Sequence, residues 1–503
     1  MIKKNYENNQ LPYSIWPVNM IAKLENDGAN YFGISLYDIM LRAGKAIYEH
    51  VCTNWPNAKY WLILCGNGNN GGDGYATACI AKTSGKKVTL IACKGTRPLS
   101  KEAQTAHDSW LSIKGKIYQP NIKWPHKVDI IIDALLGTGI NRTTSEFYFN
   151  LIEKANMHLA PILSVDMPSG LSPSNGSVLG KAIMASHTLC FIGLKPGQFI
   201  GNARDLIGKL YYVDLGLKSF LVDKKAPISR FDTSFLPNWL KPRKKTSHKG
   251  NHGRLLVIGG NIGTVGAVFM VAEAALRTGS GLVKLLTYKE NIIPFLTARP
   301  EIMIDEITND KLTESLLWAD VIVVGPGLGH HDLAKRILEK ISFIKKPMVW
   351  DADALSFLAI TKDKCHNRII TPHPGEASLL LNMRTMEVEQ DRLYAVKSLV
   401  DKYGGVVVLK GAGTIIADEK GNIGIADVGN AGMASGGMGD VLSGIIASLV
   451  GQKLEIFDAA CAGCVIHGAA ADELAVNRGT RGMLATDLFK ILWKFVNPDF
   501  IKK

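Results

Sequence analysis

Short apolar runs, glycine-rich loops and longer helical stretches follow one another along most of the chain. In the first half, residues 60–65, 88–92, 129–133 and 162–166 are predicted strands, and residues 75–82 are a predicted helix. Short apolar strands that alternate with helices are typical of parallel sheets covered by helices. The pattern therefore predicts an α/β fold with mainly parallel strands.

The pattern stops between residues 223 and 250. Residues 241–250 form a basic, proline-bearing segment, which we interpret as a linker rather than as a nucleic-acid patch. Its last residues can belong to the next domain, because a new strand–glycine–helix unit begins at Arg254. The chain is therefore predicted to contain two domains, residues 1–225 and residues 226–503.

The overall composition is that of an ordinary globular protein. Of the 503 residues, 47% are hydrophobic and 20% are charged. The formal net charge of +13 suits an anionic small molecule, a nucleic acid or a membrane surface. We find no aromatic–basic ladder that would stack bases, and we judge no apolar stretch long enough to span a bilayer. We therefore expect small anionic substrates, no nucleic-acid partner, no membrane partner, and a homo-oligomer.

Eight cysteines are scattered through long periodic segments. The N-terminus lacks the apolar core of a signal peptide. Reduced thiols in a cytoplasm are the simpler interpretation, because a chain of this size needs no disulfide scaffold. Cys461 and Cys464 form a C-x-x-C in an Ala/Gly-rich helical stretch, where we expect core packing rather than a redox or zinc site.

A glycine-rich segment, CGNGNNGGDG at residues 65–74, follows the first of these strands and opens a helix. Glycines let the backbone approach a ligand and turn its N–H groups outward as an anion nest. The N-terminus of the helix adds positive potential for a phosphate. The alternative is a tight turn without a ligand, but five glycines in ten residues favour a binding site.

Two aspartates close neighbouring strand-like runs. Asp133 ends one run and leads into ALLGTG, and Asp166 ends another and leads into MPSGL. Carboxylates at strand ends of a parallel sheet lie on the edge where ligands bind. Either aspartate alone could cap a helix. Together with the glycine segment, they favour a site.

These residues resemble the NAD(P)H-hydrate epimerase family over roughly residues 20–222, through GNGNNGGDG, DALLGTG, SVDMPSGL and FIGLKPG. Asp38, Met40, Ala43 and Gly44 match a further helical signature. The resemblance implies a Rossmann-like three-layer αβα fold. It implies that Asp166 is the catalytic acid/base and that Asn70, Asp133 and Ser169 coordinate K⁺, for which oxygen ligands are suitable. It implies the following substrate-binding residues: Asn69, Asn70, Gly71, Gly72, Asp73, Gly137, Thr138, Gly139, Ile140, Asn141, Arg142, Thr143 and Asp166.

The second half contains GNAGMASGGMGD at residues 429–440, directly before a predicted helix at residues 441–450. Glycines and helix N-terminal N–H groups together form an anion hole. Asp440 at its rim can take a proton from a hydroxyl that attacks a phosphoryl group. The alternative is a glycine-rich turn capped by Asp440, which five glycines make a weaker interpretation.

Four further loops follow predicted strands of the second half: GPGLG at residues 325–329, DADA at 351–354, TPHPGE at 371–376 and KGAGT at 410–414. One such loop would be weak support for a ligand site. Four loops in series together with an anion hole indicate a nucleotide site. His373 alone would more often be a packed loop histidine.

From about residue 230 onward the chain is similar to ribokinase-like proteins, and in particular to ADP/ATP-dependent NAD(P)H-hydrate dehydratases. The motifs that carry this similarity are HKGNHGR, TPHPGEA and GNAGMASGGMGDVLSG. The similarity implies a ribokinase-like α/β fold. It implies that Lys410, Gly411, Ala412, Gly413, Thr414 and Gly439 bind the adenine nucleotide. It implies that Ala267, Gly327 or Gly329, His373 and the catalytic Asp440 contact the hydrated substrate.

The two resemblances together imply repair of hydrated NADH and NADPH, with R and S epimers interconverted by the first half. The second half would phosphorylate the hydroxyl of the S epimer and then expel phosphate, using ADP or ATP with Mg²⁺. ADP is the expected donor. Two alternatives stay open: a small-molecule kinase, which would release a stable phosphorylated product, and a first half that only binds nucleotides or regulates.

Overall fold

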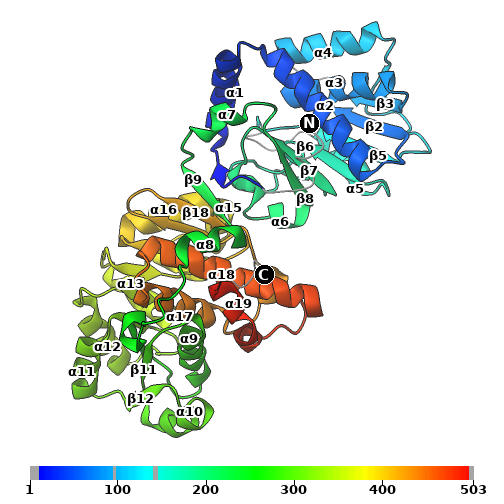
Figure 1. Cartoon of the computed structure of the whole chain (residues 1–503). Helices are drawn as coiled ribbons and strands as arrows, with labels where there is room; N and C mark the ends of the chain where they lie inside the picture. The colour runs from blue at the N-terminus through cyan, green and yellow to red at the C-terminus, as the bar shows by residue number, and fades with distance from the viewer. Residues whose placement is uncertain (1–10, 94–97, 140–145, 498–503) are drawn as a thin grey trace. The chain divides into compact units, whose positions relative to one another are not determined.

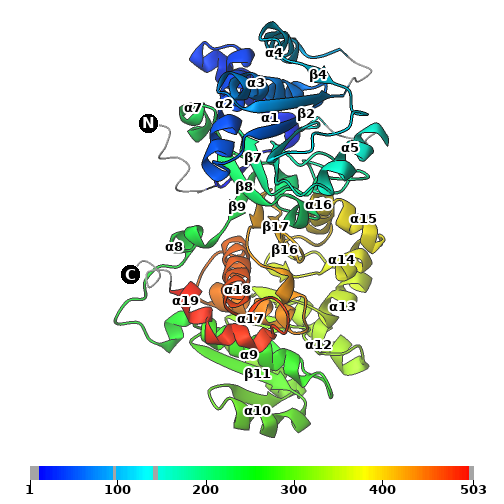
Figure 2. The same cartoon turned by 90° about the vertical axis from the view of Figure 1, so that its right-hand side faces the viewer.

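The computed structural model describes residues 11–93, 98–139 and 146–497. The chain divides into two compact units, residues 1–228 and 229–503, which are drawn from blue to green and from green to red in Figures 1 and 2. Each unit has its own sheet and its own buried core.

The first unit consists of short parallel strands joined by helices. Its strands are β1 (Ser14–Ile15), β2 (Tyr60–Cys65), β3 (Lys87–Ala92), β4 (Ile117–Tyr118), β5 (Ile130–Ala134), β6 (Ile162–Val165), β7 (His187–Phe191) and β8 (Lys209–Val213). Its helices are α1 (Val18–Phe32), α2 (Leu36–Asn54), α3 (Asn69–Thr83), α4 (Lys101–Ser112), α5 (Glu146–Asn156), α6 (Ala203–Leu206) and α7 (Lys218–Val222), with a 3₁₀ turn, η2, at Pro196–Gln198.

The first sheet has the strand order β4-β3-β2-β5-β6-β7-β8, and all its neighbours pair in parallel. Alternate residues of β2 enter different cores, because successive side chains of a strand point to opposite faces. Trp61 and Ile63 pack with α2, α3 and α4, whereas Leu62 and Leu64 pack with α5. The unit is therefore a three-layer αβα fold, as the sequence predicted.

Because β2, β5 and β6 are adjacent and parallel, their carboxyl ends share one edge of the sheet. The glycine segment follows β2, Asp133 lies in β5 and Asp166 follows β6. The topology thus brings three predicted site segments to neighbouring positions.

The second unit alternates strands and helices around a longer sheet. Its strands are β9 (Ile228–Phe231), β10 (Arg254–Ile258), β11 (Leu282–Thr287), β12 (Met303–Glu306), β13 (Val321–Val324), β14 (Met348–Trp350), β15 (Arg368–Ile370), β16 (Val406–Leu409), β17 (Ile415–Asp418) and β18 (Ile423–Ala426). Its helices are α8 (Leu236–Trp239), α9 (Val265–Thr278), α10 (Ile292–Ala298), α11 (Asn309–Trp318), α12 (Asp332–Ser342), α13 (Asp353–Thr361), α14 (Pro374–Leu381), α15 (Thr385–Gln390), α16 (Arg392–Tyr403), α17 (Met438–Gly451), α18 (Ile456–Arg478) and α19 (Leu492–Val496).

Seven neighbouring strands of this sheet, in the order β12-β11-β10-β13-β14-β15-β16, pair in parallel. The next strands, β17 and β18, are antiparallel, and β18 pairs in parallel with β9. The mainly parallel sheet confirms the predicted α/β class. The loops after β13, β14, β15 and β16 all open on one edge.

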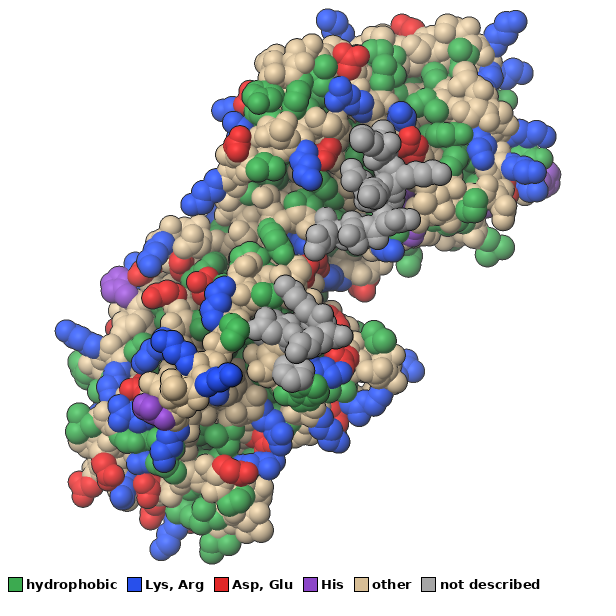
Figure 3. All heavy atoms as spheres, in the orientation of Figure 1, with side chains coloured by type: hydrophobic (Ala, Val, Ile, Leu, Met, Phe, Trp, Pro, Cys, Tyr) green, Lys and Arg blue, Asp and Glu red, His purple; other side chains and the backbone are tan. Residues whose placement is uncertain are grey.

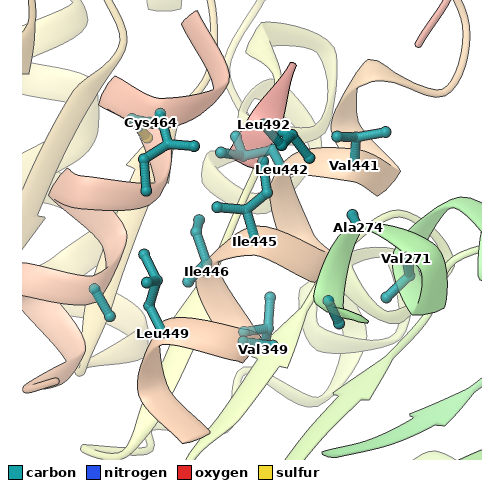
Figure 4. Close-up of a cluster of buried hydrophobic side chains, with 14 of the residues drawn as sticks. Val271, Ala274, Val349, Val441, Leu442, Ile445, Ile446, Leu449, Cys464 and Leu492 are labelled. Carbon is teal, nitrogen blue, oxygen red and sulfur yellow. The ribbon is translucent and has the colours of Figure 1, made fainter. Parts of the chain in front are cut away.

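The largest core lies where α9, α17 and α18 pack on one face of this sheet. Figure 4 shows Val271, Val349, Ile445, Ile446 and Leu449 gathered in this cluster. The other face is covered by helices such as α11 and α16.

Helix α18 corrects one expectation from the sequence. It is 23 residues long, and its most apolar window has a mean hydropathy of 1.3, which is enough to cross a membrane by length and composition. However, 78% of that window is buried inside the protein. The apolar surface of α18 therefore serves the core, where Cys461 and Cys464 are buried free thiols.

The stretch between residues 223 and 250, where the apolar pattern stops, contains a strand of the second sheet that the sequence did not predict. Strand β9 pairs with β18, and the buried Arg230 bonds to Asp427 at 2.8 Å. Farther along, the Arg243 guanidinium donates to the carbonyl of Gly279 at 2.5 Å. Strand β9 was not predicted, because a four-residue strand close to prolines and lysines has little hydrophobic pattern of its own.

Candidate active sites

The glycine segment of the first unit is the beginning of α3 rather than a loop in front of it. Helix α3 begins at Asn69, six residues before the predicted start, and Gly68 is its N-cap. A Cβ on Gly66 would overlap the carbonyl oxygen of Leu135, and a Cβ on Gly71 would overlap that of Gly66. These glycines therefore permit close backbone approach, and the N–H groups of the first turn of α3 lie directly beside the ends of β2 and β5.

The first turn of α3 contains the predicted ligand-binding amides. Asn70 is only 9% exposed, and its Nδ2 has no hydrogen-bond partner among the described residues. Its side chain faces Gly137, where a Cβ would lie 3.1 Å from Asn70 Cγ. Asn69 accepts a hydrogen bond from Ser100 Oγ. The structure therefore brings Asn69, Asn70 and the start of the segment 137–143 together.

Part of the predicted substrate loop can be placed. Gly137, Thr138 and Gly139 follow β5 at the same sheet edge. Ile140, Asn141, Arg142 and Thr143 lie outside the described residues.

The helical signature in α2 packs against the first turns of α3. Asp38 forms a capping box with Ser35 at the start of α2. A Cβ on Gly72 would lie 2.5 Å from Met40 Cε, and one on Gly44 would lie 2.8 Å from Ala76 Cβ. Helices α2 and α3 are thus in close contact, and this signature is explained by packing.

Asp133 is a fully buried carboxylate at the end of β5. Its oxygens accept hydrogen bonds from Ser169 N at 2.9 Å, Ser169 Oγ at 2.5 Å and Ser164 Oγ at 2.8 Å. Burial nevertheless raises the pKa of Asp133 above its usual value, because hydroxyl and amide donors offset only part of the lost hydration. A buried carboxylate of this kind is favourable for a bound cation.

Asp166 follows β6 with a left-handed backbone, φ +66°. Such a conformation is costly for a residue with a Cβ and persists only when its surroundings hold it. Gln198 Nε2 donates to the Asp166 carbonyl at 3.0 Å, and Phe191 N donates to its carboxylate at 3.2 Å. The carboxylate is only partly exposed, so it is aimed and anchored at the sheet edge.

Lys195 was not predicted as a site residue, although the motif FIGLKPG contains it. Its side chain is fully buried, and its ammonium donates to Asp166 Oδ1 and to Cys190 Sγ, the latter at 3.3 Å. The Asp166 carboxylate holds the pKa of Lys195 above its usual value despite burial. Lysines are rarely buried without a partner. The sequence did not reveal this pair, because Lys195 and Asp166 are 29 residues apart along the chain.

Two further carboxyls lie near Asp166. Burial and the charge of Asp166 raise the pKa of Glu25, in α1, to about 7, and Lys195 opposes that rise. Burial, Glu25 and Asp166 raise the pKa of Asp73 well above its usual value. Glu25 was missed by sequence analysis, because nothing near it in α1 resembles a motif.

In the second unit, the predicted anion hole lies at the N-terminus of α17. Helix α17 begins at Met438, and its N-cap Gly437 has φ +86° and no side chain that could cap the helix. Gly439 and Asp440 lie in the first turn. The N–H groups of that turn are therefore available to an anion.

Lys410, at the end of β16, reaches this turn. Its Nζ donates to Asp351 Oδ1 at 2.9 Å and lies 3.7 Å from Glu376 Oε2. A Cβ on Gly439 would lie 3.3 Å from the same Nζ. The structure therefore brings together the predicted nucleotide residues Lys410 and Gly439.

The charges around Asp440 change its acidity. Burial raises the pKa of Asp440 to about 7, and Asp351, Glu376 and Asp353 contribute to the rise while Lys410 opposes it. A carboxylate with such a pKa can accept a proton near neutral pH, which a general base must do.

The segment after Lys410 is held by a buried arginine. Arg392 donates to the carbonyls of Leu409 and Lys410 at 3.1 and 3.2 Å. A Cβ on Gly411 would lie 2.6 Å from Arg392 Nη1. Gly413 is left-handed at φ +71°, and Thr414 Oγ1 donates to the Gly411 carbonyl at 3.2 Å. Residues 410–414, including Ala412, thus form a turn of defined shape.

Gly327 and Gly329, in the loop after β13, are hydrogen-bonded to neighbouring segments. The Gly327 carbonyl accepts hydrogen bonds from Asn261 N at 2.5 Å and from Thr264 Oγ1 at 3.0 Å. Gly329 N donates to Asp353 Oδ2 at 2.8 Å. Ala267 lies in the first turn of α9, whose N-cap is Thr264. Ala267 and the loop 325–329 are therefore neighbours.

His373 is the N-cap of α14. Its Nδ1 accepts hydrogen bonds from Gly375 N and Glu376 N, and its own N–H donates to Glu376 Oε2 at 2.7 Å. The ring is largely exposed. His373 therefore positions Glu376 near Lys410, and its own Nε2 lies 3.6 Å from Glu376 Oε1.

Among residues 11–93, 98–139 and 146–497, no group of three or more His, Cys, Asp or Glu side chains is placed to hold a metal ion. A potassium site built from an amide, a hydroxyl and a single carboxylate would contain only one such side chain.

These two arrangements are candidate enzyme sites, one on each α/β unit. Residues 36–197 match the family model described as YjeF-related protein N-terminus, and residues 255–494 match that of NAD(P)H-hydrate dehydratase. The chain is 55% identical over 493 residues to the Bifunctional NAD(P)H-hydrate repair enzyme Nnr of Escherichia coli (strain K12), covering 98% of this chain and 96% of that protein. The chain therefore belongs to the bifunctional NAD(P)H-hydrate repair enzymes, which have an epimerase and a dehydratase activity.

Other known proteins are consistent with this assignment. The corresponding enzyme of Vibrio cholerae is 41% identical and covers 97% of this chain and 99% of that protein. A solved ribokinase-like protein from Enterococcus faecalis is 29% identical with a TM-score of 0.51, and the match covers 55% of this chain and 97% of that one. The predicted family and its bifunctional enzyme class are confirmed.

Proposed function

We propose that the site at the N-terminus of α17 dehydrates the S epimer of hydrated NAD(P)H by phosphorylation from ADP or ATP, and that the site around Asp166 interconverts the R and S epimers. The observation that carries the dehydratase assignment is the meeting of Lys410 and Asp440 at the open first turn of α17. A cation, free N–H groups and a base near neutral pKa are what phosphoryl transfer to a hydroxyl requires.

In the dehydratase site, Asp440 accepts the proton of the hydroxyl group on the substrate ring. The oxygen of that hydroxyl group attacks the terminal phosphorus of the nucleotide. The new O–P bond forms as the bond to the leaving nucleotide breaks. Lys410 and the N–H groups of α17 balance the phosphoryl charge. Phosphate then leaves with the ring oxygen, the neighbouring carbon loses a proton, and the ring double bond is restored.

Residues of the turn after β16 and of the first turn of α17 are proposed to bind the nucleotide: Lys410, Gly411, Ala412, Gly413, Thr414 and Gly439. Residues at the starts of α9, α14 and α17 and in the loop after β13 are proposed to bind the hydrated ring: Ala267, Gly327 or Gly329, His373 and Asp440. Support comes from the hydrogen bonds that link Asn261, Gly327, Gly329 and Asp353 into one loop cluster. ADP is the proposed donor, with ATP as the alternative, and Mg²⁺ enters as part of the nucleotide co-substrate.

In the epimerase site, Asp166 is the proposed acid/base. Epimerisation needs a group that gives a proton to the departing hydroxyl and takes one from the returning water. The anchored Asp166 carboxylate beside the Lys195 ammonium has the geometry for that exchange. The substrate contacts of Asn69, Asn70, Gly71, Gly72, Asp73 and residues 137–143 are proposed on the same basis.

Asn70, Asp133 and Ser169 are proposed to hold K⁺. Their chemistry fits a hard monovalent ion, because a buried carboxylate, a hydroxyl and an amide supply only oxygen ligands. A bound K⁺ would supply a positive charge at the sheet edge. The observation that supports this fit is the fully buried Asp133 carboxylate, which lies within hydrogen-bond distance of the Ser169 hydroxyl.

Two properties of the whole protein are also proposed. Eight free thiols are suited to a reducing cytoplasm. On the face shown in Figure 3, Lys and Arg side chains are interspersed with Asp and Glu, and the net charge of +13 supports small anionic substrates. A homo-oligomer is expected, and light scattering after size-exclusion chromatography would test it.

One absorbance experiment tests the division of labour. Wild-type protein with ADP or ATP and Mg²⁺ is given a mixture of both epimers of hydrated NADH, and the recovery of NADH absorbance is followed. Asp166→Asn should convert the S epimer normally and then slow to the spontaneous epimerisation rate. Asp440→Asn should lose dehydration by a factor on the order of 10² to 10⁴ while nucleotide affinity is kept. A stable phosphorylated product would instead indicate a small-molecule kinase.

A further inference from the structure

The carboxylate of Asp351 lies at the centre of the dehydratase site, although neither sequence analysis nor the family resemblance assigns it a role. Asp351 follows β14, and its side chain is 2% exposed. Oδ1 accepts a hydrogen bond from Lys410 Nζ at 2.9 Å, and Oδ2 accepts one from Ser443 Oγ at 2.7 Å. Asp351 therefore joins the end of β16 to α17.

This contact sets the direction of the lysine. The Lys410 ammonium lies beneath the first turn of α17, where a Cβ on Gly439 would be 3.3 Å from Nζ and 3.8 Å from Asp351 Oδ2. A lysine side chain has four rotatable bonds and loses much conformational freedom when it is fixed. Asp351 supplies the fixed partner that holds the ammonium at the anion hole before a nucleotide arrives.

The backbone beside Asp351 is strained in a way that supports this arrangement. Ala352 has φ +51° and ψ −120°, a conformation that residues with a Cβ rarely adopt. It separates two carboxylates with different partners, since Asp351 binds Lys410 while Asp353 accepts a hydrogen bond from Gly329 N. The strained residue therefore lets Asp351 contact Lys410 at the proposed nucleotide site while Asp353 contacts the loop after β13.

The charged groups that face Asp440 come from four elements. Asp351 lies after β14, Asp353 in α13, Glu376 in α14 and Lys410 after β16. On the far side of Lys410, burial and the ammonium lower the pKa of His467 in α18 to about 4, so this imidazole stays neutral. Asp351 is the largest electrostatic contribution to the raised pKa of Asp440, and burial is the larger cause overall.

We propose that Asp351 is a positioning residue for phosphoryl transfer, which fixes the Lys410 ammonium at the N-terminus of α17 and shields Asp440 from the full charge of that ammonium. This inference rests on the proposed roles of Asp440 and Lys410. Asp351 itself touches Lys410 and Ser443, and it acts on the reaction through them.

The test uses Asp351→Asn in the full-length protein. Asparagine keeps the shape and can still accept the Ser443 hydrogen bond, but it removes the charge. Dehydration of the purified S epimer should show a raised KM for ADP or ATP. In a plot of kcat/KM against pH, the fall on the acidic side (the acid limb) should move to lower pH by on the order of one unit. The reason is that Asp440 then faces the Lys410 ammonium without the negative charge of Asp351.

The matched control is Ser443→Ala, which removes the hydrogen bond to Asp351 Oδ2 and leaves the carboxylate charge, the Lys410 contact and the hydrogen bond from Ala352 N at 3.0 Å. Its acid limb should stay at the wild-type position. An acid limb that does not move in Asp351→Asn, or that moves equally in Ser443→Ala, would overturn the inference. Epimerase activity of the same protein samples reports on whether the first unit is intact.

Two more variants keep the result interpretable. Asp351→Glu keeps the charge but displaces it, so the KM for the nucleotide should rise while the acid limb of the pH profile stays in place. An unchanged KM would refute the positioning role, even if Asp351→Asn failed to fold. Asp440→Asn is measured in parallel. Activity in that variant would refute the proposed base, whereas an inactive Asp440→Asn with an unmoved limb in Asp351→Asn would refute only the role of Asp351.

Discussion

Single residues of the epimerase unit are constrained mainly by how closely backbones approach. Gly71 and Gly68 belong to the same motif, yet they face different surroundings. A Cβ on Gly71 would overlap the Gly66 carbonyl, whereas nothing lies within 4 Å of a Cβ on Gly68, whose φ is −94°. The two positions therefore form a matched pair.

Gly71→Ala should abolish most epimerase activity and destabilise the first unit by about 1–3 kcal/mol, the usual cost of overpacking. Gly68→Ala should leave stability within about 0.5 kcal/mol. Repair of purified R epimer and thermal unfolding measure both effects. Equal activity in the two variants would show that the close approach at Gly71 is not required.

The acidity of Asp440 predicts a pH profile for dehydration. The base acts in its ionised form, and its pKa is about 7. The kcat/KM for the S epimer should therefore fall about tenfold for each pH unit below 7 and level off above it. Reactions without enzyme correct for the acid lability of the substrate. A flat profile between pH 5.5 and 8 would contradict the role of Asp440.

At the residue scale, the sequence was informative where a motif marks a strand end, and uninformative where a partner lies far along the chain. Asp133 and Asp166 were predicted from their positions after apolar runs, and Asp440 from the glycine-rich segment that precedes a predicted helix. Lys195 and Asp351 were missed as functional residues, because their importance comes from contacts made only in the folded unit.

Among the elements, α17 serves two purposes at once. Its first turn carries Asp440 and open N–H groups, and the rest of the helix is buried against α9 and α18. Rigid packing of the helix therefore fixes the position of the anion hole.

Ile445→Ala in α17 should destabilise the second unit by about 2–5 kcal/mol, since the side chain is fully buried. Val476→Ala in α18 is the control, because Val476 is 86% exposed and should change stability by less than about 0.5 kcal/mol. Unfolding in urea measures the difference, and epimerase activity should be the same in both. A stability like that of the control would indicate that the core around α17 is loosely packed.

Element boundaries were predicted less well than element types. Strand β2 was predicted with its observed bounds, but α3 begins six residues earlier than its apolar pattern suggested. The asparagines and glycines at its start have low helix propensity, and tertiary contacts with β2 and β5 hold them in the helix. Strand β9 was likewise not predicted from the sequence, and it is defined by its pairing with β18 in the folded unit.

At the scale of the molecule, two units with separate cores predict that the dehydratase can work alone. A chain beginning at residue 226 keeps β9 and should dehydrate the S epimer at a rate close to that of the full-length protein. Soluble expression and the absorbance assay test this. Inactive protein from this start would count against an independent second unit.

A chain beginning at residue 233 is the matched comparison. It lacks Arg230, whose guanidinium lies 2.8 Å from Asp427, and the buried Phe231. Loss of a buried ion-pair partner typically costs about 3–5 kcal/mol. This shorter protein should therefore unfold at lower temperature or aggregate, and equal stability of the two would show that β9 is dispensable.

The pairing of β9 with β18 also has a consequence for the time course of folding during synthesis. Roughly 190 residues separate these strands along the chain. At ribosomal rates of 5–20 residues per second, β9 leaves the ribosome roughly 10 to 40 s before its partner exists. The first unit can fold in that interval, but the second sheet cannot be completed until β18 has been synthesised. Slow elongation through the region between residues 232 and 422 should therefore lower the yield of active dehydratase more than that of epimerase.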